Sequence, residues 1–382
     1  MISVAIKMLV GDKLKYFGLV AGIAFASLLI IQQGSILVGL THQTGSFIRD
    51  MPQADLWIMD PEIRFSQDVI PLGDSVLPRV RGITGVDWAV PMYQGFLKSR
   101  LPDGTRQTVI LVGLDDATLI GGPPEMSKGS LEVLREDKAI IIDEGALTSK
   151  FRFKQAGTGH MDVGMTMDIN DHEMKVAGLF KASKSFFWEP TAYTTYSRAL
   201  AIAPPERKMM NFVLVKAKPG QEIAELKGRI ESVTGLKART SDDFIGITSD
   251  YILKETGILV NFGLAVGLGF LVGALVSGQM LYNFTLDNLR YYGTLKAMGA
   301  SNGRLIAMVL AQATLIGLLG YGIGLGAGSY LGKLVGDAGL AFMMPWYIPV
   351  LGGVAILGCC LLAAGISLVR VVRLEPAIVF KS

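Results

Sequence analysis

The chain has 382 residues, of which 50% are hydrophobic and only 18% are charged, and its formal net charge is +3. Soluble globular proteins average about 25% charged residues, so the composition of the whole chain differs from that of an ordinary soluble protein and indicates a membrane protein. The near balance of positive and negative charge gives no reason to expect a nucleic-acid partner.

Four uncharged runs are long enough to cross a membrane, since about 20 helical residues span roughly 30 Å of hydrocarbon. They are Phe17–Leu40, Gly257–Leu281, Leu305–Leu331 and Tyr347–Val369. We predict an α-helical membrane protein with transmembrane helices at residues 16–40, 257–283, 305–331 and 347–369. The long segment at residues 41–256 is predicted to form an extracytoplasmic domain of mixed α/β structure between the first two helices.

The start of the chain has two interpretations. Basic residues precede an apolar run that contains Ala24-Phe25-Ala26, a pattern similar to a signal-peptide cleavage site. The apolar run continues through Ile31, so cleavage would fall inside the hydrocarbon. We therefore expect the first span to remain as an anchor, preceded by an interfacial helix at residues 1–15.

Basic residues near the spans predict their orientation, because short loops rich in lysine and arginine stay on the cytoplasmic side. The segments 1–15, 284–304 and 370–382 hold three such residues each, whereas the short loop at 332–346 holds only Lys333. This pattern predicts cytoplasmic termini, a cytoplasmic loop at 284–304, a cytoplasmic tail at 370–382 and a periplasmic loop at 332–346.

Two β-α-β patterns bracket the outer domain. The first has a strand near Ala54–Met59, a helix at Asp74–Arg81 and a strand near Val86–Val90. The second has a strand at Asn211–Lys216, a helix at Gln221–Thr234 and a strand at Leu236–Arg239. Gly85 and Gly235 fit the left-handed residue past a helix end. Two such units, at about 54–92 and 209–240, can pair in one ferredoxin-like sheet.

The insertion at about residues 95–207 is predicted to be rich in β-structure. LPDGT from Leu101 marks a hairpin turn between Phe96–Ser99 and Thr108–Leu114. The run NDHE from Asn170 to Glu173 contains metal-binding side chains, but adjacent residues on a tight turn point apart, and no second ligand pair follows at a suitable spacing. We therefore favour a plain hairpin turn and expect no metal site.

The sequence carries no motif for chemistry. It has no nucleophile, dinucleotide or phosphate-binding signature, and no span has a Lys, Arg, Asp, Glu or His in its middle. The two cysteines, Cys359 and Cys360, are adjacent in the fourth span, so no disulfide is expected in the outer domain. We predict no catalytic residue and no bound cofactor in this chain. The energy for any transport or mechanical movement would come from another chain.

A proline-free stretch leads from Ser241 through the second span. Ser241 can cap a helix whose first turn contains Asp242 and Asp243, because negative charge suits a helix N-terminus. This stretch predicts either one long helix that crosses the membrane or two helices with a break near Thr256 and Gly257.

Small residues recur at every fourth position in two spans, which places them on one face of each helix. They are Gly269, Gly273 and Ser277 in the second span, and Gly320, Gly324, Gly328 and Gly332 in the third span and its end. Such faces let helix backbones approach closely in lipid. We predict that both faces are helix-packing surfaces.

The stretch YYGTLKAMGASNGRL, from Tyr291 to Leu305, lies between these two spans. Gly293 is expected to break the helix leaving the membrane, and Thr294–Met298 to form about one helical turn. Gly299 fits as its C-terminal cap, and Ser301 as the N-cap of the third span. The result would be a short cytoplasmic knob that exposes Tyr292, Leu295, Lys296 and Met298. An ordinary basic loop is the alternative on these grounds alone.

GTLKAMGAS from Gly293 resembles the cytoplasmic signature of FtsX-like, MacB-type ABC permeases, and its residues are most similar to those of DevC-type exporters. LEPAIVF from Leu374 resembles the end of that family, while ADLWIMD and GVDWAVPMYQG resemble its outer domain. The resemblance covers nearly the whole chain. Many relatives have glutamate two residues before the signature glycine, where this chain has Tyr291.

The resemblance implies a homodimeric permease in the bacterial inner membrane, driven by two copies of a separate cytoplasmic ABC ATPase that binds ATP and Mg²⁺. The residues implied to contact this ATPase are Arg290, Tyr291, Tyr292, Gly293, Thr294, Leu295, Lys296, Ala297, Met298 and Gly299. It further implies export of a hydrophobic or lipid-like substrate by mechanotransmission, with a periplasmic adaptor and an outer-membrane channel. Two alternatives remain, an FtsX-like regulator of a periplasmic enzyme and a motor-free receptor or scaffold.

Overall fold

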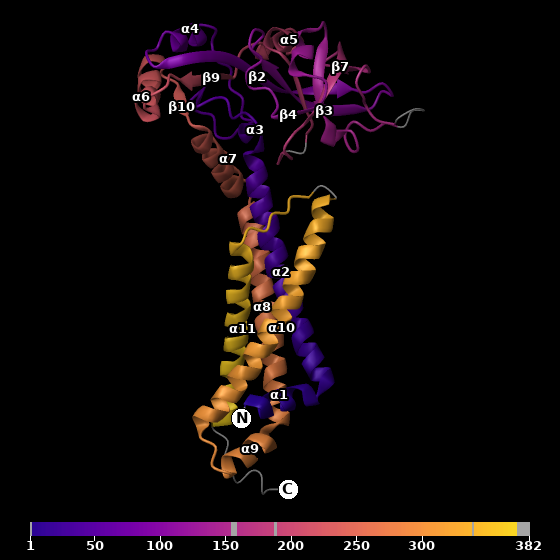
Figure 1. The fold of residues 1–382 in the computed structure, drawn as a ribbon, viewed down its shortest axis with the longest axis vertical. Helices are drawn as coiled ribbons and strands as arrows, with labels where there is room; N and C mark the ends of the chain where they lie inside the picture. Colours follow the sequence, from indigo (N-terminus) through magenta and orange to yellow (C-terminus); the bar gives the residue numbers. More distant parts are fainter. Residues whose placement is uncertain (1, 154–158, 187–188, 338–339, 373–382) are drawn as a thin grey trace. The chain divides into compact units, whose positions relative to one another are not determined.

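The protein is described by a computed structural model that covers residues 2–153, 159–186, 189–337 and 340–372. The chain divides into two compact units (Figure 1). The membrane unit comprises Met1–Leu40 and Gly257–Ser382, and the outer unit comprises Thr41–Thr256. The expected fold class is confirmed, because apolar helices form one unit and a mixed α/β domain lies between the first and second of them.

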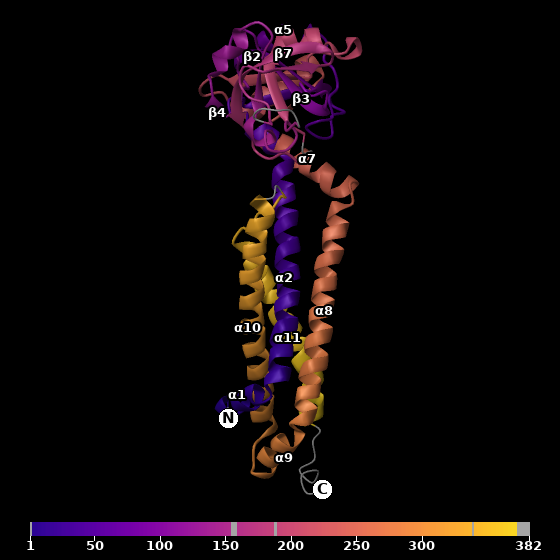
Figure 2. The same ribbon diagram turned by 90° about the vertical axis from the view of Figure 1, so that its right-hand side faces the viewer.

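Four helices of the described residues are long and apolar enough to cross a membrane. They are α2 (Lys13–Thr44), α8 (Ile258–Asp287), α10 (Asn302–Asp337) and α11 (Tyr347–Val372). Two shorter helices, α1 (Ile2–Gly11) and α9 (Leu289–Ala297), lie at one end of this bundle (Figure 2). Most of the predicted tail, including LEPAIVF, lies outside the described residues.

The four long helices share one apolar core. Its fully buried members include Leu19, Ile23, Leu281, Ile316 and Ala364. Cys359 and Cys360 are free thiols buried in the same unit. The bundle therefore holds together through close packing of apolar side chains within a single chain.

One half of the outer unit is a four-stranded antiparallel sheet. Its strands are β1 (Leu56–Met59), β2 (Val86–Arg100), β9 (Phe212–Ala217) and β10 (Lys237–Arg239). Their spatial order is β10-β1-β9-β2, and every neighbouring pair is antiparallel. This is the order of a ferredoxin-like pair of split β-α-β units.

Helices cover both faces of this sheet. On one face lie α4 (Val76–Arg81) and α6 (Ile223–Thr234), which pack Val80 and Ile230 onto strand residues such as Ile58. On the other lie α3 (Ser46–Arg49) and α7 (Ser241–Glu255), whose Phe244 packs against Trp57. The alternation of side chains along each strand places one apolar set on each face.

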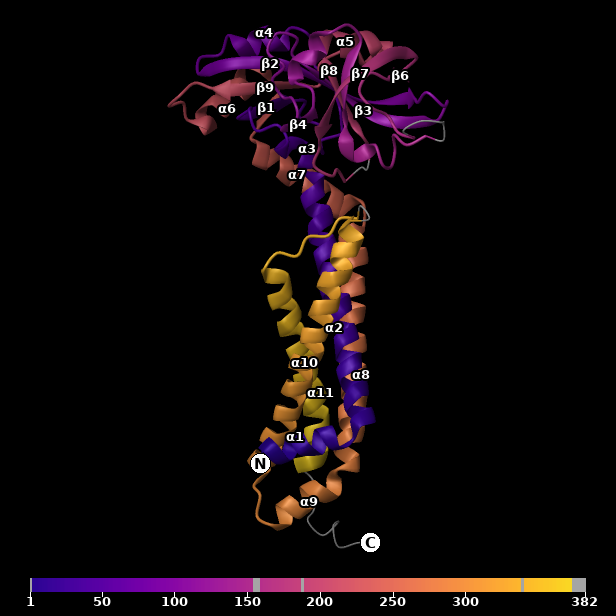
Figure 3. The ribbon, with the colours of Figure 1, turned by 45° about the vertical axis from the view of Figure 1, so that its right-hand side comes forward.

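The other half of the outer unit is a small closed barrel. It contains the second part of β2 together with β3 (Arg106–Leu114), β5 (Ala139–Asp143), β6 (Thr166–Ile169), β7 (His172–Lys181) and β8 (Thr191–Thr195). The ring runs β2-β3-β8-β5-β7-β6 and closes because β6 pairs with both β7 and β2 (Figure 3). The short strand β4 (Glu125–Lys128) pairs with β7, and α5 (Tyr196–Ile202) follows β8.

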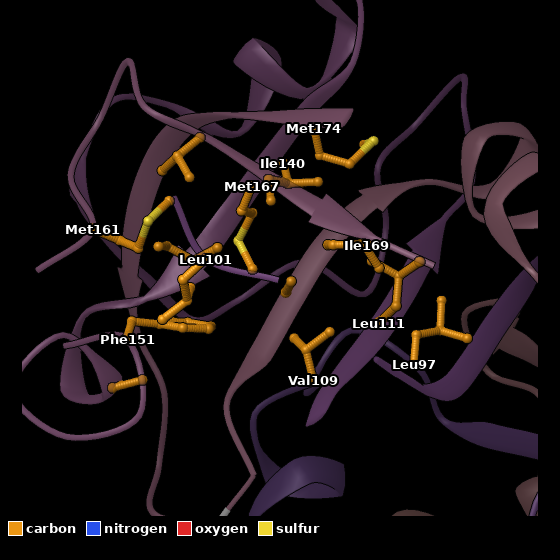
Figure 4. Close-up of a cluster of buried hydrophobic side chains, with 14 of the residues drawn as sticks. Leu97, Leu101, Val109, Leu111, Ile140, Phe151, Met161, Met167, Ile169 and Met174 are labelled. Carbon is orange, nitrogen blue, oxygen red and sulfur yellow. The ribbon is translucent and has the colours of Figure 1, made fainter. Parts of the chain in front are cut away.

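The barrel interior is filled mainly by aliphatic and methionine side chains, together with Phe151 (Figure 4). Leu97 and Leu101 enter from β2 and its turn, Val109 from β3, and Met167 from β6. The strand β2 is 15 residues long, and its first part pairs with β9 while its second part pairs with β3. This one strand therefore belongs to both halves of the outer unit.

Turn chemistry explains the two hairpins of the barrel. The LPDGT turn between β2 and β3 uses Gly104 at φ +85°. The turn between β6 and β7 uses Asn170 at φ +48° and Asp171 at φ +61°, two residue types that tolerate the left-handed region. The NDHE run therefore forms a hairpin turn. Among the described residues, no group of three or more His, Cys, Asp or Glu side chains is arranged so that it could hold a metal ion.

The helix that follows β10 differs from expectation in its cap. Thr240, not Ser241, is the N-cap residue of α7, and it forms a capping box with Asp243. The Ser241 hydroxyl instead lies 3.3 Å from Trp57 Nε1, which donates to it. The helix then ends at Glu255 and Gly257 adopts φ +69°, so α7 and α8 are two helices.

The two glycines expected past helix ends both have positive φ. Gly235 caps α6 at φ +75° as expected. Gly85, at φ +102°, lies in the turn into β2, while Gly82 takes the cap of α4 with ordinary right-handed geometry. The position expected for Gly85 was therefore wrong, because α4 ends earlier.

Candidate coupling site

The junction between α8 and α9 is made by an asparagine. Asn288 leaves helical geometry, and its side-chain nitrogen donates to the Phe284 carbonyl oxygen at 2.8 Å. An asparagine side chain competes in this way for backbone groups at helix ends. The break expected at Gly293 was wrong, because Gly293 is buried inside α9. A glycine in a helix costs only about 1 kcal/mol, which surrounding packing overcomes.

The end of α9 follows the predicted capping pattern. Gly299 adopts φ +92°, and the Ala300 amide donates to the Leu295 carbonyl at 3.0 Å. This bond belongs to a helix end closed by a left-handed glycine. The Ser301 carbonyl then accepts from the Leu305 amide at the start of α10. The loop is thus a short helix with a defined start and end.

The α9 helix has one exposed and one buried face. Tyr291 is 63% exposed and Met298 is 71% exposed, whereas Tyr292 is 0% exposed. The remaining exposed residues are Arg290, Thr294, Ala297 and Gly299. Leu295 and Lys296 are half-buried. The expected exposure of Tyr292 was therefore wrong, because the side of α9 that carries it packs into the core of the membrane unit.

Two side chains fasten α9 to neighbouring helices. The Tyr292 hydroxyl donates to Gln312 Oε1 on α10 at 3.0 Å, and burial raises the pKa of Tyr292 to about 12. This tyrosine therefore stays a neutral donor at physiological pH. Lys296 Nζ donates to the Val372 carbonyl oxygen at 3.1 Å, where a cation suits the C-terminal end of α11.

An open groove of about 800 Å³ lies between α1 and α9. Its lining includes Val4 and Met8 from α1, Tyr291 and Leu295 from α9, and Met298, the C-cap residue of α9. The groove is therefore mainly apolar, and its lining also includes the charged residues Lys7, Asp12 and Asp287.

An ion cluster lies beside this groove. Lys15 Nζ is 3.0 Å from an Asp12 carboxylate oxygen and 2.5 Å from one of Asp287. The hydrogen bonds from Lys15 hold the pKa of Asp12 below its usual value. The cluster joins the start of α2 and the turn before it to the end of α8. Neither this cluster nor the contribution of α1 to the groove was predicted from the sequence.

The small-residue face of α10 packs along α2. A Cβ atom built on Gly320 would lie 2.6 Å from Ile23 Cγ2, and one on Gly324 would lie 2.4 Å from the Ala24 carbonyl oxygen. Gly328 leaves more room, with Ile31 at 3.5 Å. Gly332 instead faces the ring of Phe342, in the segment between α10 and α11.

The small-residue face of α8 packs on a different side of α2. A Cβ atom on Gly273 would lie 2.7 Å from Ala26 Cβ, and one on Gly269 would lie 3.3 Å from Leu29 Cβ. Ser277 is buried, and its hydroxyl donates to the Gly273 carbonyl. Figure 2 shows α2 between α8 and α10, so these glycines make contacts within one chain.

Two family models match nearly the whole chain. Residues 17–233 match the MacB-like periplasmic core domain. Residues 252–376 match the FtsX-like permease C-terminal domain, which includes α8, α9, α10 and α11. The boundary between the two matched ranges lies close to the boundary between the outer and membrane units.

Individual relatives are distant. The uncharacterized ABC transporter permease MJ1507 of Methanocaldococcus jannaschii is 24% identical over 190 residues, which are 47% of this chain and 47% of that protein. The chain thus matches about half the length of this curated relative.

Two solved structures are similar to part of this chain. The periplasmic region of MacB from Actinobacillus actinomycetemcomitans is 15% identical with a TM-score of 0.36, covering 51% of this chain and 92% of that one. The extracellular domain of the noncanonic ABC-type transporter YknZ from Gram-positive bacteria is 13% identical with a TM-score of 0.33, and the match covers 49% of this chain and 98% of that one. The family assignment rests on the two family models, of which the MacB-like one alone covers more than half of the sequence. This protein therefore belongs to the MacB-like, FtsX-type family of ABC transporter permeases.

Proposed function

We propose that this permease couples ATP hydrolysis in a separate cytoplasmic ATPase to export of a hydrophobic or lipid-like substrate from the periplasmic side by mechanotransmission. Two copies would form a homodimer with two ATPase chains in the bacterial inner membrane, with both termini cytoplasmic and the outer unit periplasmic. The DevC-like loop residues support a periplasmic adaptor and an outer-membrane channel as further partners. ATP and Mg²⁺ would bind to the ATPase, and we assign no cofactor to this chain.

The observation that carries this proposal is the construction of α9. Tyr291 and Met298 form an exposed apolar surface, while Tyr292 and Lys296 fasten the same short helix to α10 and α11. An exposed apolar patch on a rigid support is a feature of protein contact sites. A force applied to α9 would therefore be passed to the long helices.

Helix continuity supports the mechanical part of the proposal. The helix α2 continues without a break to Thr44, whose hydroxyl lies 2.7 Å from the Ser249 hydroxyl of α7 within the outer unit. Gly45 allows close packing there, because a Cβ atom on it would lie 2.7 Å from Ile245 Cγ2. The two segments by which the chain enters and leaves the outer unit are thus joined side by side.

The proposal is tested by placing charge on the exposed face of α9. We expect Tyr291→Asp with Met298→Asp to leave insertion and melting temperature unchanged, because both side chains are exposed. Burying two carboxylates in a contact costs several kcal/mol, so ATPase copurification should fall at least about tenfold. Matched controls are Met209→Asp and Val233→Asp, since these exposed apolar residues belong to the outer unit.

Undiminished ATPase copurification by the α9 variant would contradict the coupling role. The proteins that copurify with the wild type distinguish the remaining alternatives. An ATPase with an adaptor supports export, and an ATPase with a periplasmic enzyme supports regulation. Recovery of no ATPase supports the motor-free scaffold.

Orientation in the membrane gives a separate prediction. In a cysteine-free variant, we expect a single cysteine at Asp103 to react with an impermeant reagent on cells whose outer barrier is permeabilised. A cysteine at Asn302 should react only after lysis, because it lies in the segment predicted to be cytoplasmic. Both positions are exposed, so accessibility within the fold does not limit labelling. If the cysteine at Asn302 but not the one at Asp103 were labelled before lysis, the topology would be the opposite of the one proposed.

A further inference from the structure

A buried chain of hydrogen bonds links three helices at the end of the bundle that carries α9. The Tyr292 hydroxyl of α9 donates to Gln312 Oε1 of α10 at 3.0 Å. Gln312 Nε2 then donates to the Ala5 carbonyl oxygen of α1 at 2.8 Å. The exposed fractions of Tyr292, Gln312 and Ala5 are 0%, 1% and 0%.

The direction of these bonds follows from their chemistry. A carbonyl oxygen can only accept, so the Gln312 amide must turn its NH₂ group toward Ala5. Its oxygen is then left to accept from the Tyr292 hydroxyl, which has a proton to donate. Both polar atoms of the glutamine are thus used, one by each neighbouring helix.

The apolar surroundings of Gln312 make the loss of these hydrogen bonds unfavourable in free energy. Leu9, Leu305, Met308 and Val309 belong to the same buried cluster and offer no side-chain hydrogen bond. If α1 or α9 rotated away, a buried polar group would lose its partner without gaining water. The glutamine therefore favours a single placement of α1 and α9 against α10.

We propose that Gln312 is a positioning residue that holds α1 and α9 in fixed positions against α10. It thereby maintains the groove between α1 and α9 as part of the ATPase-binding surface. The groove lined by Met8, Leu295 and Met298 is shaped by both helices, so its form depends on their relative placement. The role in ATPase binding rests on the proposed function, whereas the geometric role of Gln312 does not.

A distance measurement tests the geometry without any ATPase. Spin labels would be attached to cysteines at Val4 and Met298, which are 42% and 71% exposed and line opposite sides of the groove, in a background with Cys359 and Cys360 replaced by alanine. We expect a narrow distance distribution in the parent, and a distribution at least twice as broad after Gln312→Leu. Gln279→Leu is the matched control, because this exposed glutamine donates to Asn283 of its own helix α8 and not to a neighbouring helix within the described residues. An unchanged distribution in a folded Gln312→Leu protein would overturn the proposal.

An ATPase titration tests the consequence for binding. If only a fraction of the permease has α1 and α9 correctly placed, the apparent affinity falls by that fraction. We expect Gln312→Leu to raise the ATPase concentration for half-maximal stimulation about tenfold while the maximal rate is retained. A lower maximum at an unchanged midpoint would mean that part of the protein is merely unfolded, and would overturn the proposed role.

A double variant tests whether the two residues act together. Tyr292→Phe removes the hydroxyl that Gln312 accepts from, so each single variant breaks the same chain of bonds. We expect Tyr292→Phe with Gln312→Leu to need no higher ATPase concentration for half-maximal stimulation than Gln312→Leu alone. The reason is that an apolar pair leaves no unpaired polar atom between α9 and α10. Additive effects would contradict the proposal. If the wild-type chain binds no ATPase at all, the proposed function fails, while the spin-label result still decides the role of Gln312.

Discussion

Replacing Gly324 with leucine is expected to destabilise the membrane unit severely. A Cβ atom at this position would lie 2.4 Å from the Ala24 carbonyl oxygen and 2.5 Å from Ser27 Cβ, both on α2. A backbone carbonyl cannot rotate away as a flexible side chain can, so α10 and α2 would have to separate. Overpacking costs typically about 1–3 kcal/mol or more, and we expect the melting temperature of the purified protein to fall by about 6 °C or more.

The same helix supplies its own controls for this experiment. Gly322 and Gly326 are exposed, and a Cβ atom on either would meet no atom of another helix within 4 Å. Gly322→Leu and Gly326→Leu should therefore change the melting temperature little. Because α10 and α2 belong to one chain, the loss in Gly324→Leu should not depend on protein concentration. Equal melting temperatures for all three variants would show that this face of α10 does not pack on α2.

The second large effect is expected in the outer unit, from Trp57→Ala. The Trp57 side chain is 0% exposed, and its ring centroid lies 5.7 Å from that of Phe212 and 5.5 Å from that of Phe244. Phe244 belongs to α7, so the indole packs this helix onto the sheet. Removing a buried tryptophan costs about 3–5 kcal/mol, which should lower the urea concentration at which the outer unit becomes sensitive to protease.

Pulse proteolysis of the full-length protein across a urea series measures this loss. Trp57→Phe is the matched variant, because it retains an aromatic ring but loses part of the indole volume and the bond from Nε1 to the Ser241 hydroxyl. It removes fewer buried atoms than Trp57→Ala, so its loss of stability should be clearly smaller. If Trp57→Ala were as resistant as Trp57→Phe, the aromatic cluster would not be what holds α7 to the sheet.

Much of the fold could be predicted because it depends on properties of short segments. Hydropathy over about 20 residues identified the regions of α2, α8, α10 and α11. Turn chemistry identified the β2–β3 and β6–β7 hairpins, whose glycine, asparagine and aspartate residues adopt positive φ. The left-handed Gly299 at the end of α9 belongs to the same class. In each case the residues that determine the structure are neighbours in the chain.

Other features depend on partners that are remote in the sequence. The barrel closes through β6, a strand of only four residues, and no local pattern shows that it pairs with β2 across 68 positions. Tyr291 and Tyr292 are adjacent residues of the same type in a loop that sequence analysis treated as exposed. Only the packing of α9 on α10 makes one 63% exposed and the other 0%.

The sequence by itself therefore determined which segments are long and apolar enough to cross a membrane, where tight turns fall and to which family the loop around Gly293 is similar. The tertiary structure alone decided that Gly293 lies inside α9, that α1 contributes to the groove, and that Gln312 connects both helices. The lone amide of Gln312 in an apolar run was visible as a signal, but its partners were not. Hydropathy and capping act over one or two helical turns, whereas burial and hydrogen bonding are set by residues brought together from distant parts of the chain.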